Sequence, residues 1–316
     1  MKMLFKMMKN ATCLIGSIVS FCLFACDNET TSDVLKSGQI EIRVNPGKNN
    51  EVGFWAIADK ITIDWGDGHV EQFAGNFSAR SHTYANQDLK IITIKTEKLA
   101  LFETMLESVS IDDERLTWGY FREMRFGEMP ALARLTLGCP TLSVLEIKKA
   151  SVLTHFNLRS QLTSFDFSGL TALEEFDCTG NQFTSLDLRS LHKLKYLSCG
   201  DNKLTLLDLR GLSALVSVTC VYNQLTTLHL TGCSSLGSLV CLGNQLTSLD
   251  IGSLTSLSNL SVHDNQLTTN ALNNIFEQLP ERIPGTAFLT FANNPGSDTC
   301  NREIAINKGW LFPLLD

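Results

Sequence analysis

Short segments of alternating apolar and polar residues recur along the second half of the chain with a period of 21 residues. Each unit opens with a Leu-x-x-Leu-x-Cys segment and ends with a second alternating segment such as Leu186-Asp187-Leu188. Alternation of this kind is typical of a strand with one buried face. A unit this short cannot bury its apolar face alone, so we predict a solenoid of stacked coils with one parallel strand per coil.

Two residue types mark the register of the coils. The asparagines are Asn181, Asn202, Asn223, Asn244 and Asn265, and the cysteines three positions before the first four are Cys178, Cys199, Cys220 and Cys241. A side-chain amide can both donate and accept hydrogen bonds, so we predict an asparagine ladder at a tight bend. We expect the cysteines to face the core as small packing residues, with metal binding as the alternative.

About ten residues remain for the return leg of each coil, and their alternation favours an extended segment over a helix. The units opening at Leu132 and Leu153 are less regular, which indicates a capping region at the N-terminal end of the array. At the other end, residues 270–279 have helical spacing before Pro280, and residues 287–291 alternate as a strand. We predict a solenoid with its N-terminal cap over residues 99–280 and a C-terminal cap over 281–316.

The pattern Leu-x-x-Leu-x-Cys-x-x-Asn-x-Leu resembles the leucine-rich repeat and covers roughly half of the chain. The variant with a second Leu-x-Leu, as in LTSLDL, is similar to a type found in surface proteins of the Bacteroides group. This resemblance implies a mainly β fold with parallel strands on a concave face, and a protein that binds a partner rather than one that catalyses.

Residues 39–98 show a different sequence pattern, in which short alternating segments are separated by turn residues. The pair Asp67-Gly68 predicts a hairpin turn between Ile61–Trp65 and Val70–Phe73. The sequence Trp65-Gly66-Asp67-Gly68, followed by His82-Thr83-Tyr84, resembles the PKD domain. That resemblance implies a small immunoglobulin-like β-sandwich ahead of the solenoid.

The N-terminal residues have the features of an export signal. Lys2, Lys6 and Lys9 precede an apolar run over residues 11–25, which is too short to span a membrane comfortably. The segment Leu23-Phe24-Ala25-Cys26 resembles a bacterial lipobox. The resemblance implies a lipoprotein signal peptide over residues 1–26, a lipid on Cys26, a linker over 27–38, and a surface-exposed protein of the outer membrane. The alternative is ordinary secretion with cleavage nearby.

The charge of the chain argues against nucleic acid as a partner. The full sequence has 26 basic and 33 acidic residues, and loss of the three signal lysines leaves 23 against 33, a formal charge of −10. Seven cysteines follow Cys26, and four of them form the periodic column, so no disulfide framework is indicated. We expect a monomer without cofactors.

The predicted binding site lies where strands of the array present side chains that the core does not need. Its members are Tyr196, Val221, Tyr222, Val240, Leu242 and His263. Exposed aromatic and aliphatic side chains on neighbouring strands are typical of surfaces that anchor partners. The ligand is expected to be a protein or a glycan, with membrane contact through the lipid.

Two other functions stay open at this point. One is a polysaccharide hydrolase that uses Glu175 and Asp177, which leave the same face of one strand roughly 6 to 7 Å apart at Cα. The other is a structural surface spacer without a selective ligand. Asp64, Asp67 and His82 are predicted to be turn and strand residues, with no catalytic or metal site assigned.

Overall fold

The structure is a computed structural model that describes residues 35–46, 51–104 and 120–313. From Leu35 onward the chain forms one compact unit. The predicted signal peptide, Cys26 and most of the predicted linker lie outside the described residues. Among the helices described, none has the length and apolar character needed to cross a bilayer.

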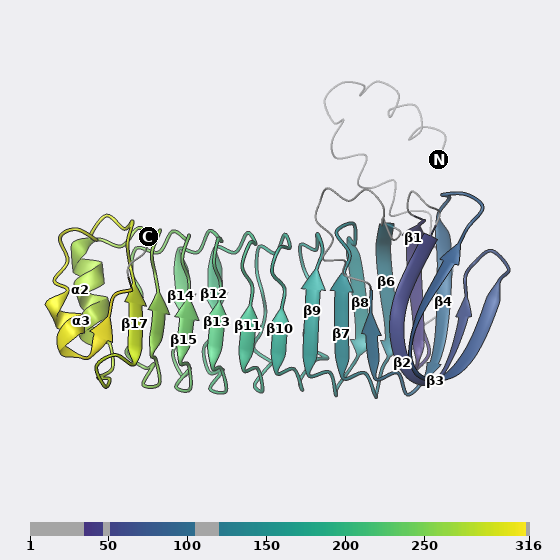
Figure 1. The fold of residues 1–316 in the computed structure, drawn as a ribbon, viewed down its shortest axis with the longest axis horizontal. Coiled ribbons are helices and arrows are strands. Elements are labelled where there is room, and N and C mark those ends of the chain that lie inside the picture. The colour runs from purple at the N-terminus through teal and green to yellow at the C-terminus, as the bar shows by residue number, and fades with distance from the viewer. Residues whose placement is uncertain (1–34, 47–50, 105–119, 314–316) are drawn as a thin grey trace, which may run out of the picture. The chain divides into compact units, whose positions relative to one another are not determined.

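The repeats form the predicted stack of coils. Their strands are β7 (Arg134–Gly138), β9 (His155–Arg159), β10 (Glu175–Asp177), β11 (Tyr196–Ser198), β13 (Ser217–Thr219), β15 (Ser238–Val240) and β16 (Asn259–Ser261). They pair in parallel, in the order of the chain, and Figure 1 shows them side by side as successive rungs. Residues 21 apart are partners, as in Glu175 with Tyr196, so the period of the sequence is the register of the sheet.

The asparagines form the predicted ladder between coils. Asn223 Nδ2 donates to the carbonyl oxygen of Cys199 in the preceding coil at 3.0 Å, and its Oδ1 accepts from the backbone N–H of Leu204 at 3.0 Å. Asn202, Asn244 and Asn265 repeat both contacts. These two contacts reach backwards, so each asparagine ties its own coil to the bend of the coil before it.

The return legs are extended, as predicted. β12 (Leu206–Asp208) and β14 (Thr227–His229) pair in parallel as a small second sheet. Asp187 and Asp208 each accept the backbone N–H of the residue two positions later, which turns the chain at the end of the leg. Arg189 and Arg210 each donate twice to the same carboxylates, so this acidic column has its own basic partners.

Six strands build the N-terminal part: β1 (Gln39–Asn45), β2 (Glu51–Asp64), β3 (Val70–Thr83), β4 (Lys90–Glu97), β5 (Leu101–Glu103) and β6 (Tyr120–Glu128). The hairpin predicted at Asp67-Gly68 is confirmed, because β2 and β3 are antiparallel with Ile61 opposite Phe73.

The strands of residues 39–98 are continuous with the first coil of the solenoid. The strands lie in one sheet that runs β7-β5-β2-β4-β1-β6-β8, where β8 (Val144–Lys149) is the return leg of the coil that begins with β7. β5 pairs in parallel with β7, and β6 pairs in parallel with β8. The two outer strands of this segment of the sheet, β7 and β8, therefore belong to the same coil. The strands between them close the N-terminal end of the stack. Sequence pattern alone identified strands there but could not show which neighbours they pair with.

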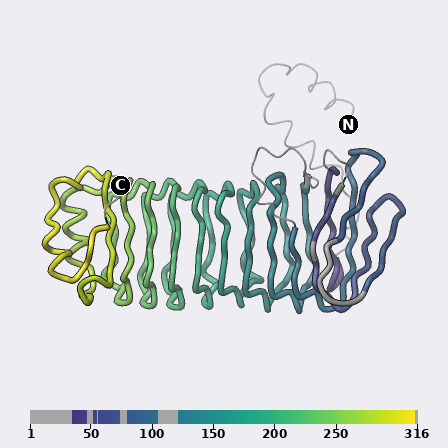
Figure 2. The backbone as a smooth tube through the Cα atoms, in the orientation of Figure 1, coloured from purple at the N-terminus to yellow at the C-terminus, as the bar shows by residue number. Residues whose placement is uncertain are grey.

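One hydrophobic core runs through the whole described unit, from Ile40 in β1 to Trp310 near the C-terminus. The periodic cysteines face this core and are fully buried, as predicted. The backbone trace in Figure 2 shows the coils following one another from the N-terminal strands to the C-terminal helices. No boundary in the core separates residues 39–98 from the solenoid.

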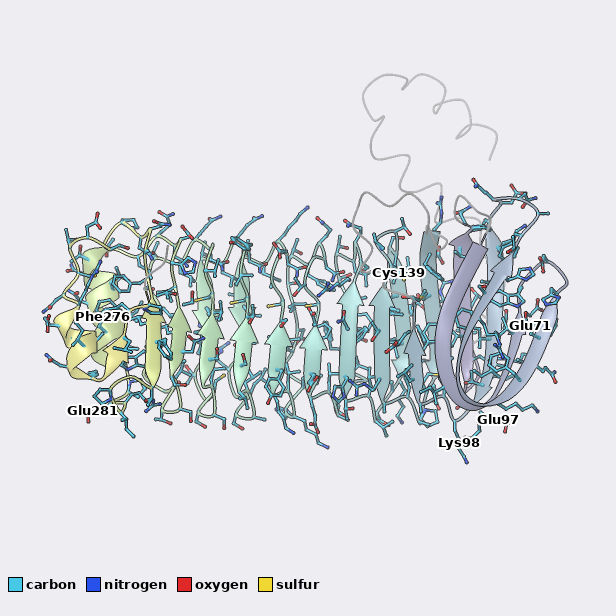
Figure 3. All side chains as sticks on the ribbon, viewed as in Figure 1. Glu71, Glu97, Lys98, Cys139, Phe276 and Glu281 are labelled. Atoms are coloured by element: carbon cyan, nitrogen blue, oxygen red, sulfur yellow. The ribbon has the colours of Figure 1, made fainter. Side chains whose placement is uncertain are left out.

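The C-terminal cap contains the predicted helix, α2 (Thr269–Gln278), and the predicted strand, β17 (Ala287–Thr290), followed by α3 (Glu303–Asn307) and β18 (Trp310–Leu311). β17 and β18 continue the parallel sheet beyond β16. Phe276 of α2 is buried in this cap and its ring packs edge-on against Phe291 at 5.2 Å between centroids (Figure 3). The cap thus covers the last coil and supplies an edge strand of only two residues.

Candidate functional site

The candidate site is the solvent-facing side of the sheet from β7 to β17, which we call the strand face. Register places its side chains in two rows. The first row contains His155, Glu175, Tyr196, Ser217, Ser238, Asn259 and Phe288, and the second contains Asn157, Asp177, Ser198, Thr219, Val240, Ser261 and Thr290. Along both rows, charged and amide side chains concentrate towards the N-terminal coils.

A polar hollow of about 280 Å³ lies at the N-terminal end of the strand face. Its polar lining consists of Glu103, Arg134, Thr136, His155, Asn157, Glu175, Asp177, Tyr196 and Ser198. Asn157 Oδ1 is buried and has no hydrogen-bond partner among the described residues. The hollow therefore offers acidic and basic side chains to a polar ligand.

The two carboxylates considered for hydrolysis line this hollow, and each lies next to a basic side chain. Glu175 Oε2 lies 3.4 Å from Nε2 of His155, and Asp177 Oδ2 lies 3.5 Å from Nη2 of Arg159. Asp177 also accepts the backbone N–H of Thr179 at 2.9 Å. The arrangement presents paired charges on an open surface, which suits recognition of a polar partner.

The predicted patch is divided by the structure. Val221, Leu242 and His263 occupy one column at the ends of successive strands, and the Tyr222 and Gly243 amides donate to the Leu242 and His263 carbonyls at 3.0 and 3.2 Å. Val240 precedes Leu242 by two residues and shares its face. We call Val221, Tyr222, Val240 and Leu242 the apolar patch.

Tyr196 does not belong to the apolar patch. It lies in the first row, and four residues of strand, about 13 Å, separate that row from the column of Val221. Its side chain lines the polar hollow and is 44% exposed. Tyr196 therefore contributes an aromatic surface to the hollow, and the predicted site becomes two neighbouring zones on one face.

Tyr222 occupies a backbone conformation that aromatic residues rarely adopt. The residue before each asparagine has a positive φ, and the other coils place Gly180, Asp201, Gly243 and Asp264 there. Tyr222 has φ of 50° and is 59% exposed. Left-handed backbone costs an ordinary residue roughly 1–2 kcal/mol, so this coil keeps a strained position for an aromatic ring directed to solvent.

The following coil accommodates that ring. A Cβ atom added at Gly243 would lie only 2.5 Å from Cδ1 of Tyr222, which means that the ring packs on the Gly243 backbone. The ring is thus held against the strand face while most of its surface stays accessible. Rigid, exposed aromatic rings of this kind are frequent at the centres of protein interfaces.

His263 is held at the edge of the site by hydroxyl groups. Its Nδ1 lies 3.0 Å from Oγ of Ser261 and 3.2 Å from Oγ1 of Thr290. His263 is half-buried and follows Leu242 in the column at the strand ends. Its fixed ring extends the apolar patch towards the C-terminal cap with a polar group.

Two exposed apolar residues at the C-terminal end of the sheet were missed from the sequence. Phe288 of β17 is 42% exposed and Leu311 of β18 is 46% exposed, and the two are partners in the sheet. The spacing of 21 residues breaks after Asn259, so the period could not place Phe288 in the first row. The only available signal was the alternation of residues 287–291.

No protein-family model matches the sequence, and no curated protein matches it. Solved structures with similar folds include a functional domain of InlJ from Listeria monocytogenes that includes a cysteine ladder, at 22% identity and a TM-score of 0.36. They also include YopM from Yersinia enterocolitica, at 23% identity and a TM-score of 0.40, and the Toll–Spatzle complex of Drosophila, at 15% and 0.46. The similarity covers 52%, 52% and 68% of this chain, and 40%, 38% and 33% of those chains, respectively.

Proposed function

We propose that this chain is a monomeric, lipid-anchored protein of the cell envelope whose strand face binds a protein partner without catalysis. The observation that carries the proposal is Tyr222, an exposed aromatic residue kept in a strained backbone position where other coils use glycine or aspartate. Glycine would adopt the same φ without strain, so the tyrosine is kept there at a cost in backbone strain. A bound partner supplies the missing benefit.

The surroundings of Tyr222 match the anatomy of a protein interface. The apolar patch provides the desolvated centre, and the polar hollow provides paired charges and hydrogen-bonding groups beside it. A partner that covers both zones would bury the aromatic rings of Tyr222 and Tyr196. A glycan is the second candidate ligand, because a tyrosine ring such as Tyr196 beside acids and amides can stack on a sugar.

The anchor is proposed from Cys26 and the segment before it, which resemble a lipobox. A lipid on this cysteine would hold the protein at the outer membrane, exposed at the cell surface. The acidic charge left after loss of the signal suits a partner with basic groups rather than nucleic acid.

The substitution Tyr222→Asn tests the proposal. Asparagine tolerates the left-handed backbone, so we expect the free energy of unfolding to rise by about 1 kcal/mol while the aromatic ring is lost. Partners captured by the immobilised full chain from cell-surface extracts are identified by mass spectrometry, and the affinity of the enriched protein is measured by biolayer interferometry. We expect the variant to bind it at least about tenfold more weakly, as for loss of an interface anchor.

The matched control is Leu206→Ser, which removes an exposed apolar side chain from the return leg, on the side away from the strand face. It should leave partner affinity unchanged. Equal affinity of wild type and Tyr222→Asn would contradict the proposed site. Selective binding of the chain on a glycan array, with no enriched protein, would favour the glycan instead.

A further inference from the structure

The β2–β3 hairpin bends back so that its turn meets the end of β3. Register shifts between Ala56 and Lys60 mark bulges, which bend a two-stranded ribbon strongly. As a result, the ring of Trp65 stacks on the ring of His82 at 5.0 Å, and Tyr84 donates from its hydroxyl to the carbonyl oxygen of Trp65 at 2.9 Å. Trp65, next to the turn, thus contacts His82 and Tyr84, which lie more than ten positions later in the chain.

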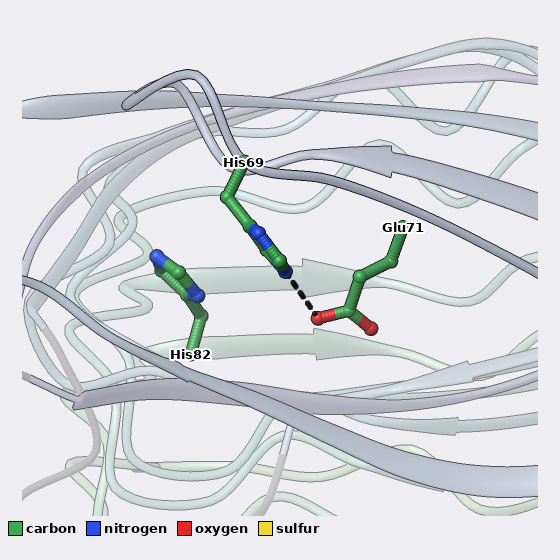
Figure 4. A group of neighbouring side chains, drawn as sticks. All are labelled: His69, Glu71 and His82. Carbon is green, nitrogen blue, oxygen red and sulfur yellow. Dashed lines mark hydrogen bonds and ion pairs between the residues drawn. The ribbon is translucent and has the colours of Figure 1, made fainter.

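This closure brings together two imidazoles and a carboxylate. His69 and Glu71 are two positions apart and face the same way, with 3.2 Å between Nε2 of His69 and Oε1 of Glu71. His82 enters from the end of β3, and one ligand atom from each of the three residues lies within 4.8 Å of the others (Figure 4). Ligand atoms around a tetrahedral zinc at ~2.1 Å are roughly 3.4 Å apart, so the cluster has nearly the required dimensions.

Asp67 orients the histidine that comes from the far end of the strand. Its Oδ2 lies 2.7 Å from Nε2 of His82, and its Oδ1 accepts the backbone N–H of His69 at 3.1 Å. A proton shared by Nε2 and Asp67 leaves Nδ1 of His82 unprotonated and able to bind a metal. A histidine that binds a metal through one ring nitrogen commonly donates a hydrogen bond from the other nitrogen to a carboxylate, which fixes the orientation of the ring.

We propose that His69, Glu71 and His82 form a binding site for a divalent transition metal of the zinc class, with Asp67 as the positioning residue of His82. Imidazole nitrogen with one carboxylate is a ligand set that suits zinc and not calcium or magnesium, which prefer oxygen alone. Three protein ligands leave a fourth position for water. The metal would fasten the turn of the hairpin to the end of β3 and stabilise the N-terminal cap.

Binding requires one side chain to move. The His69 and His82 rings are stacked with 5.1 Å between centroids and 11° between planes, so their nitrogen lone pairs do not yet converge. The His69 side chain is 52% exposed, so it is the one with room to turn. Glu71 is held meanwhile by Trp65, whose indole N–H donates to Oε1 at 3.2 Å, and by Arg80, 4.0 Å from Oε2.

Metal binding by the full chain tests this proposal. After treatment with EDTA, Zn²⁺ binding is measured by equilibrium dialysis, and Co²⁺ is used as a spectroscopic probe. We expect one equivalent of Zn²⁺ per chain and a Co²⁺ spectrum of nitrogen and oxygen ligands, without the near-ultraviolet charge-transfer band of a thiolate ligand. The thermal unfolding midpoint should rise on addition of Zn²⁺.

Variants separate the cluster from other groups. His69→Ala and Glu71→Gln replace accessible ligands and should weaken Zn²⁺ binding at least about tenfold, and Asp67→Asn should do so by about 10- to 100-fold. His192→Ala removes an exposed histidine of the solenoid and should change nothing. Circular dichroism in EDTA should show the same unfolding midpoint for wild type and His69→Ala, which confirms an intact fold.

Three results would overturn the site. The first is no Zn²⁺ binding by the wild-type chain at micromolar concentrations. The second is wild-type affinity in His69→Ala and Glu71→Gln. The third is a thiolate band in the Co²⁺ spectrum, which would place the metal on the cysteines.

Discussion

At the scale of single residues, the asparagine of each coil connects two coils through side-chain hydrogen bonds. Asn223 has three carbonyl oxygens around its Nδ2, from Cys199, Cys220 and Val221, and one amide hydrogen directed at its Oδ1. Aspartate has no hydrogen to donate and would place its charge against those carbonyls. The requirement for both a donor and an acceptor explains why asparagine recurs in five successive coils.

Asn223→Ala should lower the free energy of unfolding by about 1–3 kcal/mol, because buried backbone groups of two coils lose their partner. The measurement is equilibrium denaturation by urea. Gln224→Ala, at the exposed neighbouring position, is the control and should stay within about 0.5 kcal/mol of wild type. Equal effects of the two substitutions would show that the ladder does not contribute to stability.

At the scale of the strand, the four periodic cysteines form a buried column of thiols. Burial raises the pKa of Cys220 from 9.0 to about 12, and burial also raises the pKa values of Cys178, Cys199 and Cys241. The folded chain therefore holds protons that the unfolded chain releases above pH 9. This contribution to stability is complete below the unfolded pKa and is lost as the pH rises towards 12.

The free energy of unfolding should therefore fall between pH 9 and 12. One thiol contributes up to about 2 kcal/mol of that loss at a pH of about 10.5, from 1.4 kcal/mol per pH unit. Cys220→Ala should show a smaller fall than wild type in urea denaturation at a pH of about 8 and about 10.5. The cavity it creates affects both measurements alike, so an unchanged pH dependence would contradict a buried, protonated thiol.

At the scale of the whole described unit, the N-terminal strands and the solenoid share one sheet and one core. β5 is the link, since it pairs antiparallel with β2 and parallel with β7. Phe102 of β5 is fully buried, with ring centroids 5.4 Å from Phe54 and 5.5 Å from Phe126. Its contacts join strands on both sides of residue 98, where the sequence predicted a boundary between domains.

Calorimetry of the full chain should therefore show one unfolding transition. Phe102→Ala should lower its free energy by about 3–5 kcal/mol, as for a large buried aromatic residue. Phe276→Ala, in the C-terminal cap, should shift the same transition. Two transitions, with Phe102→Ala moving only one of them, would restore the separate N-terminal domain.

Sequence reasoning succeeded where a pattern is local and repeated. The 21-residue period located the strands, the ladder and the inward cysteines, because each coil repeats the same contacts with its neighbour. It did not find Ser160, which occupies the bend one coil before Asn181 and donates to its Oδ1 at 2.6 Å, or Asn294, which continues the ladder from the cap. Ser160 keeps the spacing of 21 residues but is not an asparagine, and Asn294 lies 29 residues after Asn265.

The sequence pattern could not predict contacts between segments that are distant in the chain. The sequence identified Asp67 and His82 but not their meeting with His69 and Glu71, because that meeting depends on how the hairpin bends. It identified Tyr222 as exposed, but the positive φ became visible only in the backbone. The order of strands in the N-terminal sheet likewise depends on tertiary pairing, because β5 and β6 pair with the two strands of the first coil, β7 and β8.

The backward direction of the asparagine contacts has a consequence for how this chain can grow. A duplicated block of 21 residues brings with it the side chain that ties it to the block before, so an extra coil inserted within the array needs no change elsewhere. The closed N-terminal end and the rung formed by Asn294 stay in place. Gene duplication can therefore lengthen the strand face in fixed steps without a new fold.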